Sequence, residues 1–93
     1  MTAAPFWKEN TEVLDEIVTT EKYDLIVFND NHNTFEHVIE TLIDVCGHKP
    51  LQAEQCTTII HYKGKCAVKM GEFDKMATMR NAICLRGISA EVQ

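Results

Sequence analysis

The chain has 93 residues, a hydrophobic fraction of 45%, a charged fraction of 25% and a formal net charge of −5. This length suits one small domain with a single core, and the acidic balance argues against nucleic-acid binding, which relies on a basic surface. No apolar run approaches the roughly 18 residues of a membrane span, and the N-terminus lacks the pattern of a secretory signal. We therefore expect a cytoplasmic protein that binds neither nucleic acid nor membranes.

Residues 1–22 are the more acidic part of the chain and show no sustained hydrophobic period. We interpret them as a mobile acidic N-terminal extension, and residues 23–93 as the core domain. The core begins with the short aliphatic run Tyr23–Phe28, bounded by turn-forming residues, which predicts a buried strand.

A helix is predicted over residues 35–46, where apolar residues recur at i, i+3, i+4 and i+7. Asn33 and Glu36 have the spacing of a capping box, so Asn33 is the expected N-cap. Gly47 suits the position that follows the C-terminus of this helix.

A second helix is predicted from Pro50, a residue favoured in the first helical turn, to about Tyr62, with Gly64 ending it. A third is predicted over residues 72–85 and ends before Gly87. The core contacts expected from this third helix are Phe73, Met76, Met79 and Ile83.

Residues 65–70 alternate with a period of two and end at Gly71, and residues 88–92 alternate in the same way. The order is β-α-α-β-α-β. It predicts an α/β fold of the α+β sandwich type, in which a small three-stranded, largely antiparallel sheet packs against three helices. The alternation in the first of these two strands places three side chains on one face: Cys66, Val68 and Met70.

Two kinds of residue could support chemistry, the thiols Cys46, Cys56, Cys66 and Cys84 and the imidazoles His32, His37, His48 and His61. The cysteines lie on or near apolar faces, where a thiol behaves as a small hydrophobe. No nucleophile elbow, phosphate loop or dinucleotide motif is present. We therefore expect reduced cysteines, no enzymatic activity and no cofactor.

A metal site could use Cys46 and His48 together with Cys56 or His61, but their spacing matches no zinc motif, so we expect no metal. The simplest interpretation of His37 and His48 is solvent exposure, on a helix surface and in a loop.

The stretch LIVFNDNHNTF joins the first strand to the first helix and concentrates polar residues at the strand end. Asn29 and Asp30 follow the strand directly, beside the helix face that begins at Phe35. A carboxylate next to an apolar hollow suits a ligand with one cation and one apolar group. His61 shares a face of the second helix with Thr57, which makes it a further candidate.

Four blocks of this sequence resemble the ClpS adaptors of bacterial ATP-dependent proteolysis: VFNDNHNTFEHVIETL, AEQCTTIIHYKGKC, GEFDKM and RGISAEV. The likeness extends over about residues 23–93, in order and without large gaps. It implies an adaptor, expected to be a monomer, that binds proteins whose first residue is Leu, Phe, Tyr or Trp. Such an adaptor delivers these N-degron substrates to a hexameric AAA+ unfoldase of the ClpA or ClpC type, which feeds the ClpP peptidase.

The resemblance also implies roles for individual residues. Asn29, Asp30 and His61 would hydrogen-bond the α-amino group and first peptide unit of the substrate. Asp74 and Met79 would contact the unfoldase. The walls of the pocket for the first side chain would be formed by Asn31, Asn33, Phe35, Val38, Thr57, Ile60 and Ile88.

The chain departs from the usual family pattern at several of these positions. Asn31 stands where a second carboxylate is usual, Thr57 and Phe35 stand where Met is common, and Met79 stands where Lys is common. The first three departures bear on the shape and charge of the pocket, and the last on the docking surface.

Two other hypotheses remain open from the sequence. One is a module of the same small fold that docks another partner through its surface, as the factor-docking domain of the ribosomal stalk does. The other is a Cys/His hydrolase, which alkylation of Cys56 would inactivate.

Overall fold

The computed structural model describes residues 21–93, so the predicted mobile extension lies outside the described residues except for its last two. The elements in chain order are β1 (Tyr23–Phe28), α2 (Phe35–Cys46), α3 (Pro50–Lys63), β2 (Lys65–Gly71), α4 (Phe73–Leu85) and β3 (Ala90–Val92). The predicted order and the α+β class are confirmed.

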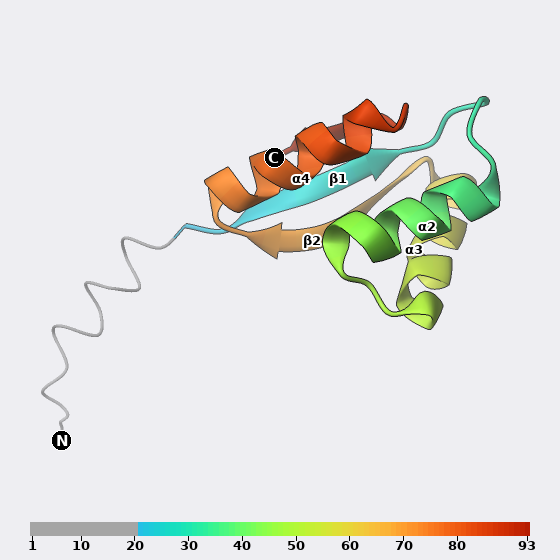
Figure 1. Cartoon of the computed structure of the whole chain (residues 1–93), viewed down its shortest axis with the longest axis horizontal. Coiled ribbons are helices and arrows are strands. Elements are labelled where there is room, and N and C mark those ends of the chain that lie inside the picture. The colour runs from blue at the N-terminus through green and yellow to red at the C-terminus, as the bar shows by residue number, and fades with distance from the viewer. Residues whose placement is uncertain (1–20) are drawn as a thin grey trace, which may run out of the picture.

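The sheet has the strand order β2-β1-β3, and β1 pairs antiparallel with both neighbours. β1 is the central strand, and its residues Leu25, Ile26 and Val27 are all buried. Leu25 and Val27 belong to the core cluster, while Ile26 is buried outside that cluster. The loop that leaves the end of β1 leads directly to α2 (Figure 1).

The helices bury their apolar faces against the sheet. α4 contacts β1 and β3, while α3 contacts β2 and α2 (Figure 1). Leu25 from β1, Leu42 from α2 and Ile83 from α4 are at most 1% exposed and meet in one core. Burying a side chain of this size contributes about 1.5–3 kcal/mol. The start of α4 differs from expectation, because Phe73 is 52% exposed and packs edge-on against Tyr23 at the rim of the sheet.

An irregularity in β2 corrects two expectations. The pairing steps from Leu25↔Lys69 to Ile26↔Ala67, which leaves Val68 as an extra residue, a β-bulge. The bulge interrupts the alternation, so Met70 is exposed while Val68 is buried. The Val68 carbonyl is held by Nε2 of His48 at 2.7 Å. His48 is therefore buried, and its predicted exposure in a loop is wrong.

The N-cap of α2 is Thr34, which corrects the prediction of Asn33. The hydroxyl of Thr34 accepts a hydrogen bond from the His37 N–H at 3.0 Å, so Glu36 is one residue too early for a capping box. The predicted end of α2 is confirmed, because Gly47 adopts a left-handed conformation with φ of 72°. Gly64 ends α3 with φ of 95°, a backbone conformation that glycine adopts without steric cost.

Candidate functional site

A pocket of about 330 Å³ opens between the loop that follows β1, the start of α2 and the last turns of α3. Its lining residues are Asn29, Asp30, Asn31, Asn33, Thr34, Phe35, Val38, Thr57, Ile60 and His61. The structure therefore brings together all the residues that the sequence suggested for substrate binding except Ile88. Thr34, which the family resemblance did not suggest, also lines the pocket.

Helices α2 and α3 supply the apolar wall of the pocket. Phe35 and Val38 face it from α2, and Thr57 and Ile60 face it from α3. The Thr57 hydroxyl donates to the Ala53 carbonyl at 2.7 Å within its own helix. Because that donor is already used, Thr57 adds little polarity to the wall.

The position of Ile88 differs from expectation. It is 3% exposed and belongs to the core cluster, and it is not among the residues that line this pocket. Its N–H donates to the Ile83 carbonyl at 3.4 Å, which turns the chain inward after α4 toward β3.

The polar rim of the pocket is organised around the carboxylate of Asp30. Its Oδ1 accepts the N–H groups of His32 at 2.8 Å and Asn33 at 2.9 Å, and its Oδ2 accepts Nδ2 of Asn33 at 2.7 Å. A carboxylate that bonds the backbone two residues further on forms an Asx turn. The sequence DNHN is therefore both a turn and the rim of a pocket.

These bonds act on the ionisation of Asp30. The backbone N–H of Asn33 is the strongest influence that lowers the pKa of this carboxyl below its ordinary value of 3.8. Burial, the second-largest influence, raises the pKa, and the His32 N–H, the Asn33 amide and the charge of His32 each lower it further. Asp30 is thus a fixed negative charge at neutral pH.

The other polar side chains of the rim have hydrogen-bonding capacity to spare. Among the hydrogen bonds formed within residues 21–93, none uses the side chain of Asn29, Asn31 or His61. The His61 ring stands edge-on to Phe35, with 6.4 Å between the ring centroids. The backbone of Asn29 is held by its N–H, which donates to the Gly64 carbonyl at 2.9 Å and so joins the strand end to the end of α3.

The two residues suggested for unfoldase docking lie on α4, which contributes no lining residue to this pocket. Asp74 is exposed in the first turn of α4. Met79 is partly buried against the core, so only part of its surface is open to a partner. The two predicted functions therefore occupy different surfaces of the described domain.

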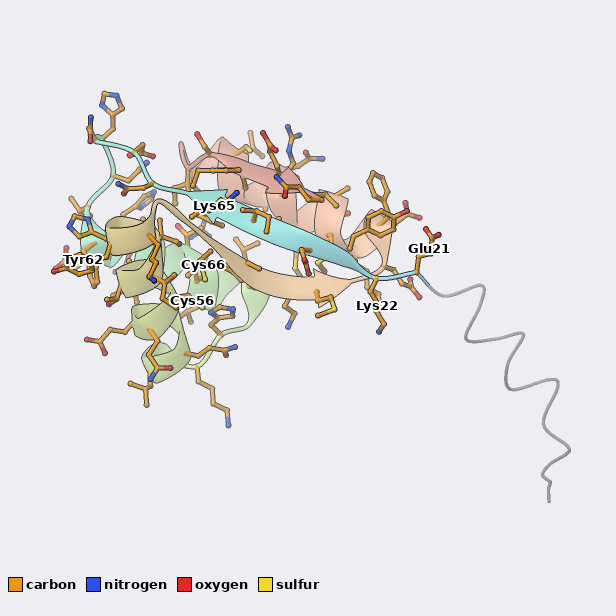
Figure 2. The ribbon with its side chains drawn as sticks, turned by 180° about the vertical axis from the view of Figure 1, so that it is seen from behind. Glu21, Lys22, Cys56, Tyr62, Lys65 and Cys66 are labelled. Atoms are coloured by element: carbon orange, nitrogen blue, oxygen red, sulfur yellow. The ribbon has the colours of Figure 1, made fainter. Side chains whose placement is uncertain are left out.

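Two of the four thiols have a raised pKa. Burial raises the pKa of both Cys46 and Cys66 to about 11. Cys56 on α3 and Cys66 on β2 lie side by side (Figure 2), and Cys56 is a second, smaller cause of the raised pKa of Cys66. Thiols in the protonated form are poor nucleophiles, so Cys46 and Cys66 are not activated for nucleophilic attack.

The described residues also bear on a metal site and on membrane-spanning helices. Within residues 21–93, no group of three or more His, Cys, Asp or Glu side chains is arranged to hold a metal ion. The ring of His48, which the sequence offered as a ligand, is instead bonded to Val68. None of the helices in this same range has both the length and the apolar character needed to cross a membrane.

The chain is similar to known proteins in both sequence and fold. The family model described as ATP-dependent Clp protease adaptor protein ClpS matches residues 18–87. The E3 ubiquitin-protein ligase UBR1 of Homo sapiens is 34% identical over 70 residues, and UBR1 of Mus musculus matches equally. That region is 72% of this chain but only 4% of UBR1.

Two bacterial proteins match over more of their own length. The structure of Agrobacterium tumefaciens ClpS2 bound to L-phenylalaninamide superimposes with a TM-score of 0.74 at 19% identity, over 78% of this chain and 95% of that chain. The ATP-dependent Clp protease adapter protein ClpS of Clostridium acetobutylicum is 32% identical over 75 residues, which are 81% of this chain and 74% of that protein. With the match of the family model, this likeness shows that the chain belongs to the ClpS family of ATP-dependent Clp protease adaptors.

Proposed function

We propose that this protein is an adaptor for substrates with a bulky hydrophobic N-terminal residue. It binds the free α-ammonium group at Asp30 and the first side chain in the adjacent pocket, and delivers the substrate to a ClpA- or ClpC-type unfoldase for degradation by ClpP. The observation that carries the proposal is the ionised Asp30 carboxylate at the rim of a cavity walled by Phe35, Val38 and Ile60.

The cavity has room for the proposed ligand. Its volume of about 330 Å³ exceeds the roughly 150 Å³ in which an apolar cavity can hold a benzene-sized ring. The ligand in the Agrobacterium ClpS2 structure, L-phenylalaninamide, combines a free amine with an aromatic side chain. The pocket described above has a complementary group for each part.

The energetics require both parts of the ligand at once. Burial of a Leu or Phe side chain contributes about 1.5–3 kcal/mol, and a hydrogen bond to a charged group about 1.5–3 kcal/mol before entropy costs. Either contribution alone gives weak binding. Acetylation of the N-terminus should abolish binding, because it removes the positive charge and leaves Asp30 facing an amide.

Asn31 reduces the negative charge at the rim, since it stands where a second carboxylate is usual in the family. Among the lining residues, Asp30 supplies the carboxylate, and its neighbours Asn29 and Asn31 carry neutral amides. The discrimination between charged and neutral N-termini should therefore depend on Asp30 to an unusual degree.

Binding is tested by fluorescence anisotropy with peptides that begin with free Phe or Leu and with the same peptides acetylated. We expect binding of the free peptides only, and a loss of affinity above a pH of roughly 8, where a peptide α-amino group loses its proton. Asp30→Asn should weaken binding at least tenfold. Glu36→Gln, which neutralises a nearby exposed carboxylate outside the pocket, should change it less than twofold. Equal affinity for free and acetylated peptides would refute the proposal.

Delivery is tested separately from binding. Asp74→Lys, on α4, should reduce unfoldase-dependent degradation of a Phe-initiated substrate while leaving peptide affinity unchanged. Glu40→Lys makes the same charge reversal on the exposed face of α2 and is the matched control. If partner capture persists after Asn29→Ala and Asp30→Ala together, the surface-docking hypothesis is favoured instead.

A further inference from the structure

Asn33 links two segments that are far apart in the sequence. Its amide nitrogen Nδ2 donates to Oδ2 of Asp30 at 2.7 Å and to the Gly87 carbonyl at 2.8 Å. A primary amide has two N–H groups, so both are used by these acceptors. The Asn33 side chain therefore has no donor left for a ligand in the pocket.

The Gly87 carbonyl belongs to a turn that is also held in other ways. Nε2 of His37 on α2 is 2.9 Å from the Arg86 carbonyl, and the Arg86 guanidinium donates to Asp44 at 3.1 Å. These contacts fasten the turn after α4 to α2 without Asn33. Gly87 thus gives Asn33 a fixed anchor point.

The rotamer of Asp30 depends on the same amide. Backbone N–H groups hold only Oδ1, whereas Oδ2 is held by Nδ2 of Asn33. Without that amide, the carboxylate could rotate about its terminal bond, which has a broad and soft torsional preference. A carboxylate that must meet an ammonium group gains affinity if its orientation is set before binding.

We propose that Asn33 is a positioning residue that uses the Gly87 carbonyl as an anchor to aim the Asp30 carboxylate at the substrate ammonium. The inference rests on the proposed function, adds to the place of Asn33 in the pocket wall and replaces its expected role as helix cap. On this inference the turn after α4 helps to support the ammonium site through Asn33, although that turn lies outside the pocket.

The inference has a signature in the ionisation of Asp30, because the amide of Asn33 is one of the groups that lower its pKa. The backbone N–H of Asn33, the larger influence, remains when the side chain is removed. The other charged or titratable groups that face this carboxylate are His32 on the same loop and His61 across the pocket on α3. Removal of the amide should therefore raise the pKa of Asp30 toward its ordinary value.

The test compares Asn33→Ala with His37→Ala, which removes another bond to the same turn but leaves Asp30 untouched. The pKa of Asp30 is measured by carboxyl ¹³C NMR without ligand, and the affinity for a free-amine Phe peptide by anisotropy. We expect Asn33→Ala to raise the pKa and to weaken binding about five- to tenfold, consistent with one hydrogen bond to a charged group. His37→Ala should change the pKa and the affinity less than Asn33→Ala does, because the contact of Arg86 with Asp44 still holds the turn.

An unchanged Asp30 pKa in Asn33→Ala, or an equal loss of affinity in both variants, would overturn the inference. Asn33→Ser keeps a turn-forming residue and provides the same comparison if the alanine variant does not fold. Failure of the proposed function has a different result, because the wild-type protein would then bind free and acetylated peptides alike. The NMR comparison needs no ligand and distinguishes the two failures.

Discussion

Asp30 combines a structural and a binding role in one side chain. It accepts two backbone N–H groups and one side-chain amide, which shape the loop between β1 and α2. The same carboxylate lines the pocket. Asp30→Asn is therefore a better probe than Asp30→Ala, because it removes the charge and keeps a side chain that can form the turn.

Asp30 should also make the stability of the protein depend on pH. Its pKa is lowered in the folded state, so the stabilisation is present above the ordinary value of 3.8 and is lost as the pH falls through the folded-state pKa. Urea unfolding should show a constant stability difference between wild type and Asp30→Asn from about pH 5 to 8, and a smaller one at pH values below 3.8. A difference that does not shrink in acid would contradict the role given to these hydrogen bonds.

At the scale of elements, the connection between α2 and α3 is secured to the sheet by one buried histidine. His48 is 4% exposed, and its Nε2 bonds the carbonyl of Val68, the bulge residue of β2. Nδ1 of the same ring is buried without a hydrogen-bond partner. The bulge frees a carbonyl from the regular ladder, and His48 satisfies it.

His48→Ala should destabilise the fold by about 2–4 kcal/mol, because it leaves a cavity and an unsatisfied buried carbonyl. The free energy of unfolding in urea measures this loss. His32→Ala is the matched control, since the side chain of His32 is exposed, and it should change the stability by less than about 0.5 kcal/mol. Equal effects of the two substitutions would show that His48 does not secure the bulge.

At the scale of the whole molecule, the fold gathers cysteines that are separated along the chain. Cys46, Cys56 and Cys66 come from α2, α3 and β2 and pack in or against the core, whereas Cys84 is exposed on α4. The spacing of ten residues between Cys46, Cys56 and Cys66 corresponds to no helix or strand period. Tertiary packing alone brings the first three into one region.

Alkylation rates should follow this arrangement. In the folded protein at pH 7.5, iodoacetamide should label Cys84 first, while Cys46 and Cys66 lag because burial raises the pKa of each thiol to about 11. Peptide mass spectrometry resolves the individual sites, and in urea the four rates should converge. Labelling of Cys46 as fast as Cys84 under native conditions would show that the core is more open than the structure indicates.

Much of the fold could be predicted because it is encoded locally. The bounds of β1 follow from a short aliphatic run between turn-forming residues, and those of α2 follow from apolar periodicity. Gly64 marks the end of α3 because few other residues adopt its backbone conformation. The clustering of Asn29, Asp30 and His61 at one pocket was expected from a family resemblance, and the structure brings them together. Their roles in binding remain predictions.

The errors concern choices that local sequence leaves open. Asn33 and Thr34 are both acceptable caps, and the long-range bond from Asn33 to Gly87 directs Asn33 away from α2. The bulge residue Val68 and the buried His48 are joined by a hydrogen bond across 20 positions. Neither residue carries a signal of this pairing in its own neighbourhood.

The sequence by itself determined the order of elements, the apolar faces and the presence of a polar cluster at the end of β1, because periodicity and turn chemistry act over a few residues. Only the tertiary structure decided what that cluster does. It assigned the cap to Thr34, placed Ile88 in the core, and joined Asn33 to a carbonyl 54 positions away. The physical reason is that hydrogen bonds and packing form between residues that the fold brings close, whatever their separation along the chain.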